Sequence, residues 1–227
     1  MPLPVRRLLG IMTITIPIEK KNAFESVCFA DRHFQRHLNK KLMIIISNYT
    51  LIEKSNLIIF VKNAEEITCP CCDAKLEVIG SRPRKYISSD GNRHTLVIRR
   101  LRCTTCRKIH HELPDILVPY KRYDSQSIES TLTSEGNLTV AAEKSTIKRW
   151  MSWFHSLKDY MLRIIIATRL RFDYEAVEKE LYHIPSTVLH GIWYFVGSEL
   201  KWLSRAVRIL ANTNSYLHTR SAFMSKT

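Results

Sequence analysis

The sequence predicts an α+β fold, in which a small β-rich segment is followed by an all-helical one. Two observations predict it. Strand-like and turn-like residues lie between two pairs of closely spaced cysteines, and helical periodicity dominates from about residue 123 to 210. We therefore divide the chain into an N-terminal extension (1–42), a β-rich domain (43–122) and a helical domain (123–227).

The first 42 residues show no sustained hydrophobic period, and we expect little regular structure in them. Two β-rich runs follow at about 43–47 and 56–61, with a polar stretch between them. Further along, "AKLEVIGSR" and "RKYIS" read as strands and "RHTLVIRRLRC" as the returning strand. Asp90-Gly91, just before the returning strand, predicts a hairpin turn.

Cysteines stand at both ends of this hairpin. Cys69-x-x-Cys72 and Cys103-x-x-Cys106 have equal spacing, with 30 residues between the pairs. Two such turns at the base of a hairpin can supply four tetrahedral thiolates, so we predict one structural Zn²⁺ in a zinc ribbon. A disulfide is the alternative. Cys71 is then a spare thiol or a packing residue, and His110 and His111 are rival ligands that four thiolates make unnecessary.

Helical signals follow an extended linker. "LPDILVPYKRY" contains Pro114 and Pro119 and predicts the linker. Helices are then expected from Ser125 to near Gly136, over about 138–143, and from Ser145 onward. Pro185 separates two more, the longest being "STVLHGIWYFVGSELKWLSRAVRIL".

The helix beginning at Ser145 has two distinct faces. Ile147, Trp150, Met151 and Phe154 recur at i, i+3, i+4 and i+7, as in a buried stripe, and Trp153 fits either a core or an interface. Its other face carries the polar and basic residues Thr146, Lys148, Arg149 and Ser152. With the helices before it, this pattern predicts a helix-turn-helix at about 125–157, although an ordinary amphipathic core helix has the same pattern.

The chain is strongly basic, with 35 Lys+Arg against 21 Asp+Glu and a net charge of +14. Such an excess favours a polyanionic partner, either nucleic acid or an anionic membrane surface. Residues 82–108 hold nine basic side chains and a single acid, Asp90. We expect DNA contacts from Arg82, Arg84, Lys85, Arg99, Arg100 and Arg102, although a solvated basic face explains the same pattern.

Three stretches together resemble an uncharacterised bacterial family of unknown function, which is similar to the zinc-ribbon and helix-turn-helix front ends of transposases. They are "CPCC" to "VPYKRY", "EKSTIKRWMSWF" and "SRAVRILANTNSYLHTRSAFMS". The resemblance covers about residues 43–224 and implies binding of double-stranded DNA in a mobile-element context. It also implies a natural start near Met43.

The sequence contains no catalytic triad, phosphate-binding glycine loop or set of strand-borne carboxylates, so we expect a DNA-binding protein that is not an enzyme. The alternative is an accessory subunit that docks a transposase, integrase or polymerase through the ribbon and C-terminal helices. A nuclease or transposase acting alone lacks the necessary ligands. With no apolar run of membrane-spanning length and no signal-peptide pattern, we expect a cytoplasmic protein without a membrane partner.

Overall fold

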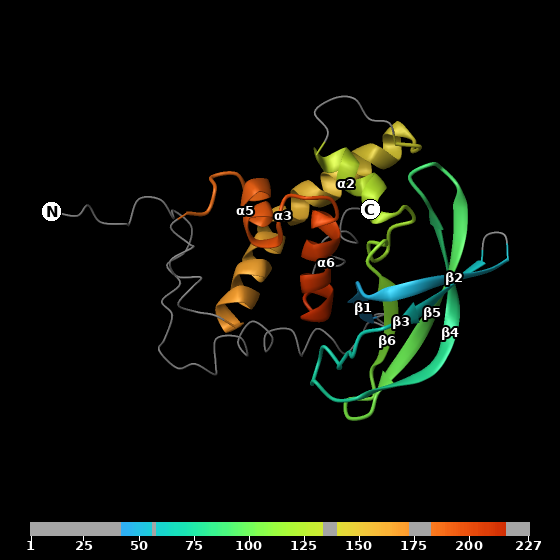
Figure 1. Ribbon diagram of the computed structural model, residues 1–227. Coiled ribbons are helices and arrows are strands. Elements are labelled where there is room, and N and C mark those ends of the chain that lie inside the picture. Colours follow the sequence, from blue (N-terminus) through green and yellow to red (C-terminus); the bar gives the residue numbers. More distant parts are fainter. Residues whose placement is uncertain (1–41, 56–57, 134–139, 173–182, 217–227) are drawn as a thin grey trace. The chain divides into compact units, whose positions relative to one another are not determined.

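A computed structural model describes residues 42–55, 58–133, 140–172 and 183–216, and every structural statement below concerns these residues (Figure 1). The strands are β1 (Leu42–Ile46), β2 (Tyr49–Ser55), β3 (Ile58–Asn63), β4 (Leu76–Ile87), β5 (Arg93–Cys103) and β6 (Ile109–Pro114). The helices are α2 (Ser125–Thr133), α3 (Lys144–Phe172), α5 (Val188–Val196) and α6 (Trp202–Asn212). The predicted α+β class is therefore confirmed.

Strand β5 organises a mixed sheet with the path β1-β6-β5-β3-β2. β4 pairs antiparallel with one edge of β5 along its whole length. The opposite edge is shared, because β3 pairs in parallel with residues 95–97 of β5 and β6 pairs antiparallel with residues 100–102. β1 then adds to β6 in parallel.

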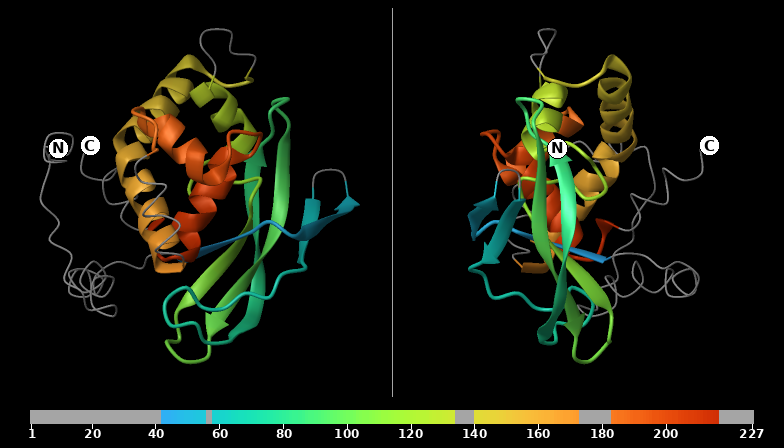
Figure 2. Two further views of the ribbon diagram at one scale, coloured as in Figure 1. Left: turned by 60° about the vertical axis from the view of Figure 1, so that its left-hand side comes forward. Right: turned by 90° about the vertical axis from the view of Figure 1, so that its right-hand side faces the viewer.

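The β4–β5 hairpin confirms the predicted Asp90-Gly91 turn (Figure 2). Gly91 has a φ of 85°, and the loop is closed by Ser88 N–H donating to the carbonyl of Asn92 at 3.0 Å. The two strands expected before the turn are one strand with a bulge between Val78 and Gly80. Gly80 has a φ of 143°, which a residue with a side chain rarely adopts.

The predicted linker at 113–123 does join the sheet to α2, but its first two residues belong to β6 and much of it is buried. Leu113, Leu117 and Val118 are fully buried, and the N–H of Asp115 donates to the carbonyl of Ile46 at 2.9 Å. The hydroxyl of Tyr49 donates to the carboxylate of Asp115 at 2.8 Å. Prolines end regular structure without requiring exposure, and here the backbone between them is held by the sheet.

The expected helix over 138–143 is not found in the part that the structure describes, because residues 140–143 are not helical and 134–139 lie outside the described residues. α3 itself runs for 29 residues. Its buried stripe includes Trp153, 2% exposed, whereas Met151 is 53% exposed, so the expected burial of Met151 is wrong.

Two other expectations fall on the C-terminal and N-terminal segments. The long helix expected after Pro185 is split into α5 and α6 at Gly197, whose φ is 83°. The guanidinium of Arg205 holds the break by donating to the carbonyls of Val196 and Leu200.

The expected extension 1–42 lies outside the described residues apart from Leu42, as does most of the helix expected before Pro185.

Sheet and helices contribute to the same hydrophobic core. It includes Leu96 and Ile98 of β5, Met161 of α3 and Leu210 of α6, all fully buried. At the sheet edge, the side chain of Asn212 in α6 accepts from the N–H of Ile45 at 2.8 Å and donates to its carbonyl at 2.9 Å. Of the described helices, none combines the length and the apolar character that crossing a bilayer requires.

Candidate metal centre

Two short loops with matching backbone geometry present the cysteines. The N–H of Cys69 donates to the carbonyl of Ala74 at 2.9 Å, and the N–H of Cys103 donates to that of Lys108 at 3.0 Å. In each loop the residue after the second cysteine is left-handed, with φ of 56° at Asp73 and 59° at Arg107. Each loop therefore curls back so that its two sulfurs face the same point.

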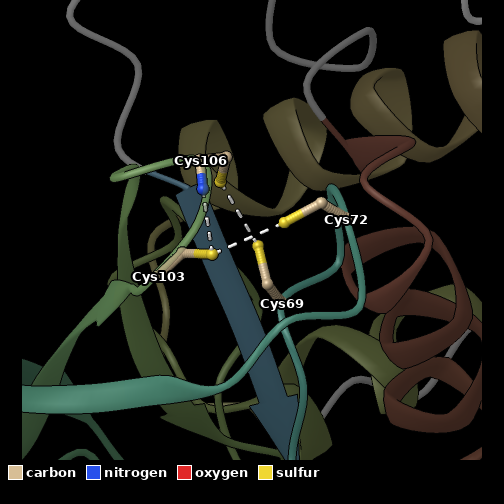
Figure 3. Close-up of side chains that lie close together, drawn as sticks. All are labelled: Cys69, Cys72, Cys103 and Cys106. Atoms are coloured by element: carbon tan, nitrogen blue, oxygen red, sulfur yellow. Dashed lines mark hydrogen bonds between the residues drawn. The ribbon is translucent and has the colours of Figure 1, made fainter.

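The four sulfurs converge at the base of the hairpin, where Leu76 of β4 pairs with Cys103 of β5 (Figure 3). The Sγ atoms of Cys69 and Cys106 are 3.6 Å apart, those of Cys72 and Cys103 are 3.5 Å apart, and all four lie within 4.8 Å of one another. Four thiolates bound tetrahedrally at about 2.3 Å from one ion would be separated by about 3.8 Å. The predicted set can therefore hold one metal ion without large rearrangement.

The protein environment shifts the pKa values of Cys69 and Cys103 in opposite directions. Burial acts to raise the pKa of Cys103, but the backbone N–H groups of Cys106 and Thr105 lower it to about 6. Burial raises the pKa of Cys69 far above the usual value, because a thiolate there loses its hydration. A bound cation would stabilise the buried thiolates, so metal binding and thiol ionisation are coupled at this site.

Cys71 and His110 form a second group around Cys69. The Nε2 of His110 is 3.4 Å from the Sγ of Cys69, and possible ligand atoms of all three residues lie within 4.8 Å of one another. His110 is fully buried, and its Nδ1 has no hydrogen-bond partner among the described residues. Burial, and then the charge of Lys108, lower the pKa of His110 to about 4. A neutral His110 can donate an Nε2–H hydrogen bond to the sulfur of Cys69.

The six basic residues expected on the hairpin divide between the two faces of the strands. Arg82 and Arg84 stand directly opposite Ile98 and Leu96, so they share the face that contributes to the core. Arg100 and Arg102, two and four residues beyond Ile98, continue this face toward the metal centre. Lys85 and Arg99 lie on the opposite face by the same alternation.

Arg99 has a partner that the sequence did not indicate. Its Nε and Nη2 atoms donate to the two carboxylate oxygens of Glu112 on β6, each at 2.6 Å. Glu112 is 1% exposed, and this hydrogen bonding raises the pKa of Arg99. The register of β5 against β6 brings Arg99 close to Glu112. Because the sequence did not indicate β6 as a strand, this ion pair could not be predicted from it.

The four residues expected on the helix lie in the first turns of α3. Lys148, Arg149 and Ser152 are exposed, and Thr146 is half-buried. Lys148 and Ser152 also line a groove of about 530 Å³ that reaches Leu132 of α2 and Leu189 of α5.

Residues 120–124 contact both the end of β4 and the start of α3, and these contacts were not expected from the sequence. The N–H of Ile87 donates to the carbonyl of Arg122 at 2.8 Å. The Nζ of Lys121 is 4.4 Å from the ring centroid of Trp153, and the Tyr123 ring packs edge-on against that of Trp150. The hairpin and the start of α3 are therefore held together by this segment.

Comparison with known proteins gives one family match. Residues 69–150 match a domain of unknown function, DUF6431. The matched region begins at the first ligand cysteine and includes both cysteine loops, the hairpin, α2 and the start of α3. It is consistent with the expected resemblance to an uncharacterised domain and carries no link to transposases. Neither the curated proteins nor the solved structures gave a match.

Proposed function

We propose that this protein binds double-stranded DNA and uses one structural Zn²⁺ to fix the base of its β4–β5 hairpin. The observation that carries the proposal is the placement of the four-cysteine cluster at the end of a strand pair with four arginines on one face. A closed set of four thiolates leaves no open coordination position, so the metal supplies structure and not catalysis.

Four thiolates in tetrahedral geometry suit zinc or iron. Zinc is the metal proposed because Zn²⁺ is not redox-active, which suits a purely structural role. Elemental analysis of purified protein should find one zinc per chain. A chain that carries stoichiometric iron in place of zinc would contradict this assignment.

Contacts to DNA are proposed from two surfaces. Arg82, Arg84, Lys85, Arg100 and Arg102 of the hairpin would contact backbone phosphates, with Arg99 less available because it is paired with Glu112. The exposed side of α3 would enter a groove through Thr146, Lys148, Arg149 and Ser152. In this proposal, α2 and α3 take the part of a helix-turn-helix, and residues 134–139 between them lie outside the described residues.

The test is binding of a labelled random duplex, followed by fluorescence anisotropy from ~50 to ~200 mM salt. The native protein should bind at micromolar concentration or below, with affinity falling steeply as salt rises. The double variant Lys148→Gln/Arg149→Gln should bind more weakly than native protein, and Lys54→Gln/Lys62→Gln on β2 and β3 is a charge-matched control. Lack of detectable binding by native protein at ~50 mM salt would overturn the proposal.

The biological setting proposed is that of a mobile-element protein without its own catalytic site, and it rests on the sequence resemblance alone. An accessory role is the second candidate, favoured by the exposed apolar side chains Ile52 and Ile58, which share one face of β2 and β3 and are each 42% exposed. The apolar stripe of α6 offers it no support, because Leu203, Val207 and Leu210 are buried inside the protein. Co-purification with a transposase or recombinase encoded nearby, abolished by Ile52→Ser/Ile58→Ser, would favour this role.

A further inference from the structure

Arg82 and Arg84 of β4 and Arg122 of the connection between β6 and α2 lie near one another, because the charges of Arg82 and Arg122 both act on Arg84, and we call these three residues the arginine cluster. Arg82 and Arg84 are two residues apart on one strand and therefore project from the same face. The Nη2 of Arg84 donates to the carbonyl of Lys121 at 2.5 Å, which brings the guanidinium to the segment that carries Arg122. Arg122 is itself exposed, so the cluster is open to solvent.

The cluster lacks an acidic partner among the described residues. None of its members forms an ion pair with a carboxylate there, in contrast to Arg99, Arg205 and Arg208. The Nε of Arg82 is buried and has no hydrogen-bond partner in this part of the chain. Burial, followed by the charges of Arg82 and Arg122, lowers the pKa of Arg84. An arrangement of like charges with an unsatisfied buried donor is costly unless an anion joins it.

A phosphate group is the anion that such an arrangement fits best. A guanidinium presents its N–H groups in a planar fork that can hold two phosphate oxygens at once, and several forks can share one phosphate. The guanidinium of Arg84 is held by its hydrogen bond to the Lys121 carbonyl, so this side chain loses less freedom when an anion binds.

We propose that Arg82, Arg84 and Arg122 form a binding site for one phosphate group. This inference rests on the DNA-binding function proposed above only for the source of the phosphate group, which is then the DNA backbone. It adds Arg122, which lies outside the hairpin, to the contact residues. It also makes Arg82 and Arg84 parts of a single site on the face of β4 nearest residues 120–122.

The first arm of the test uses duplex DNA and the full chain. The variant Arg82→Gln/Arg122→Gln keeps Arg84 and its bond to Lys121. Its control, Arg93→Gln/Arg169→Gln, removes two exposed arginines elsewhere and lowers the net charge equally. The cluster variant should bind DNA at least about tenfold more weakly than the control, with the slope of log affinity against log salt smaller by about 0.9, as expected for one lost phosphate contact.

The second arm uses pyrophosphate without DNA. Pyrophosphate at low salt should raise the melting temperature of the native protein and the control but not that of the cluster variant. In the absence of anions, the cluster variant should melt at or above the native temperature, because two mutually repelling charges have been removed. A merely structural role for these arginines predicts the opposite, a lower melting temperature.

The two arms separate failure of this inference from failure of the proposed function. Equal losses of DNA affinity and of salt slope in the two variants would overturn the inference and leave DNA binding intact. If native protein binds no DNA but pyrophosphate stabilises it through the cluster, the function fails and the site stands as one for a free phosphate compound. Equal pyrophosphate stabilisation of the cluster variant and the control, without DNA binding, overturns both.

Discussion

At the residue scale, the three neighbouring cysteines of the first loop differ in position. Cys69 and Cys72 form a group with the downstream pair, whereas Cys71 forms a second group with Cys69 and His110. Replacing Cys72 by serine removes one of the four thiolates, so Cys72→Ser should lose the metal and much of the stability of the hairpin. Cys71→Ser, a matched change one residue away, should retain one metal ion per chain. Metal content and thermal unfolding of both variants are the measurements.

The same two variants also test whether Cys71 and not Cys72 holds the metal ion. If Cys72→Ser keeps stoichiometric metal and Cys71→Ser loses it, the ion is held by the Cys69, Cys71 and His110 group instead of the four-cysteine set.

Lys121 gives the protein a specific dependence on pH. Burial lowers the pKa of its ammonium from 10.5 to about 8. The ammonium lies over the ring of Trp153. Between these values the unfolded chain binds more protons than the folded one, so the contribution of Lys121 to the free energy of unfolding rises with pH. Well below pH 8 both states are fully charged and this dependence disappears.

The variant Lys121→Met should lack this dependence. In urea unfolding at pH 8, 9 and 10, the free energy of unfolding of native protein minus that of the variant should therefore increase with pH. Other titrating groups are common to both proteins and cancel in the difference. A difference that stays constant over this range would show that Lys121 is fully solvated in the folded state.

At the element scale, the sequence predicted those features that a local pattern determines. The returning strand at 93–103 and the Asp90-Gly91 turn follow from alternation and turn residues, and the four-cysteine cluster follows from spacing. α3 begins at Lys144, one residue before the expected Ser145, and the hydroxyl of Ser145 bonds the side chain of Glu143 instead of capping the helix. β2 was missed because an exposed edge strand with Glu53 and Lys54 has no apolar alternation. β6 was missed because buried His110 and Glu112 look like surface residues until their partners are known.

Helix α6 begins without a side-chain cap of its own, and a neighbouring helix supplies the acceptor. The carboxylate of Glu129 in α2 accepts from the N–H groups of Lys201 at 2.7 Å and Leu203 at 2.9 Å, and Glu129 is 5% exposed. Because one buried and one partly buried donor lose a charged acceptor, Glu129→Ala should lower the free energy of unfolding by about 2–4 kcal/mol. Glu129→Gln keeps one carbonyl acceptor and should lose less.

Urea unfolding of both variants measures this effect. Equal losses for Glu129→Ala and Glu129→Gln would mean that the negative charge, and not the pair of hydrogen bonds, stabilises the start of α6.

At the scale of the whole molecule, the four-cysteine cluster and the hydrophobic core are made of different residues. None of the four ligand cysteines is a member of the core cluster, which includes residues of β1, β5, α3 and α6. The sequence could predict the ligands from spacing, but the packing of α6 on β1 depends on contacts such as Asn212 with Ile45, 167 residues apart. No local pattern encodes a contact of that separation.

This separation predicts how the protein responds to removal of its metal. Chelation at neutral pH leaves Cys69 as a buried thiol with a raised pKa and removes the ion that joins the two cysteine loops, whereas the contacts of Met161 and Leu210 are unchanged. Amide hydrogen exchange after chelation should therefore accelerate first at residues 69–76 and 103–110, with the amides of α3 and α6 still protected. Readdition of zinc should restore the slow exchange. Simultaneous loss of protection in the loops and in both helices would mean that the core cannot persist without the metal, and that the two regions fold as one cooperative unit.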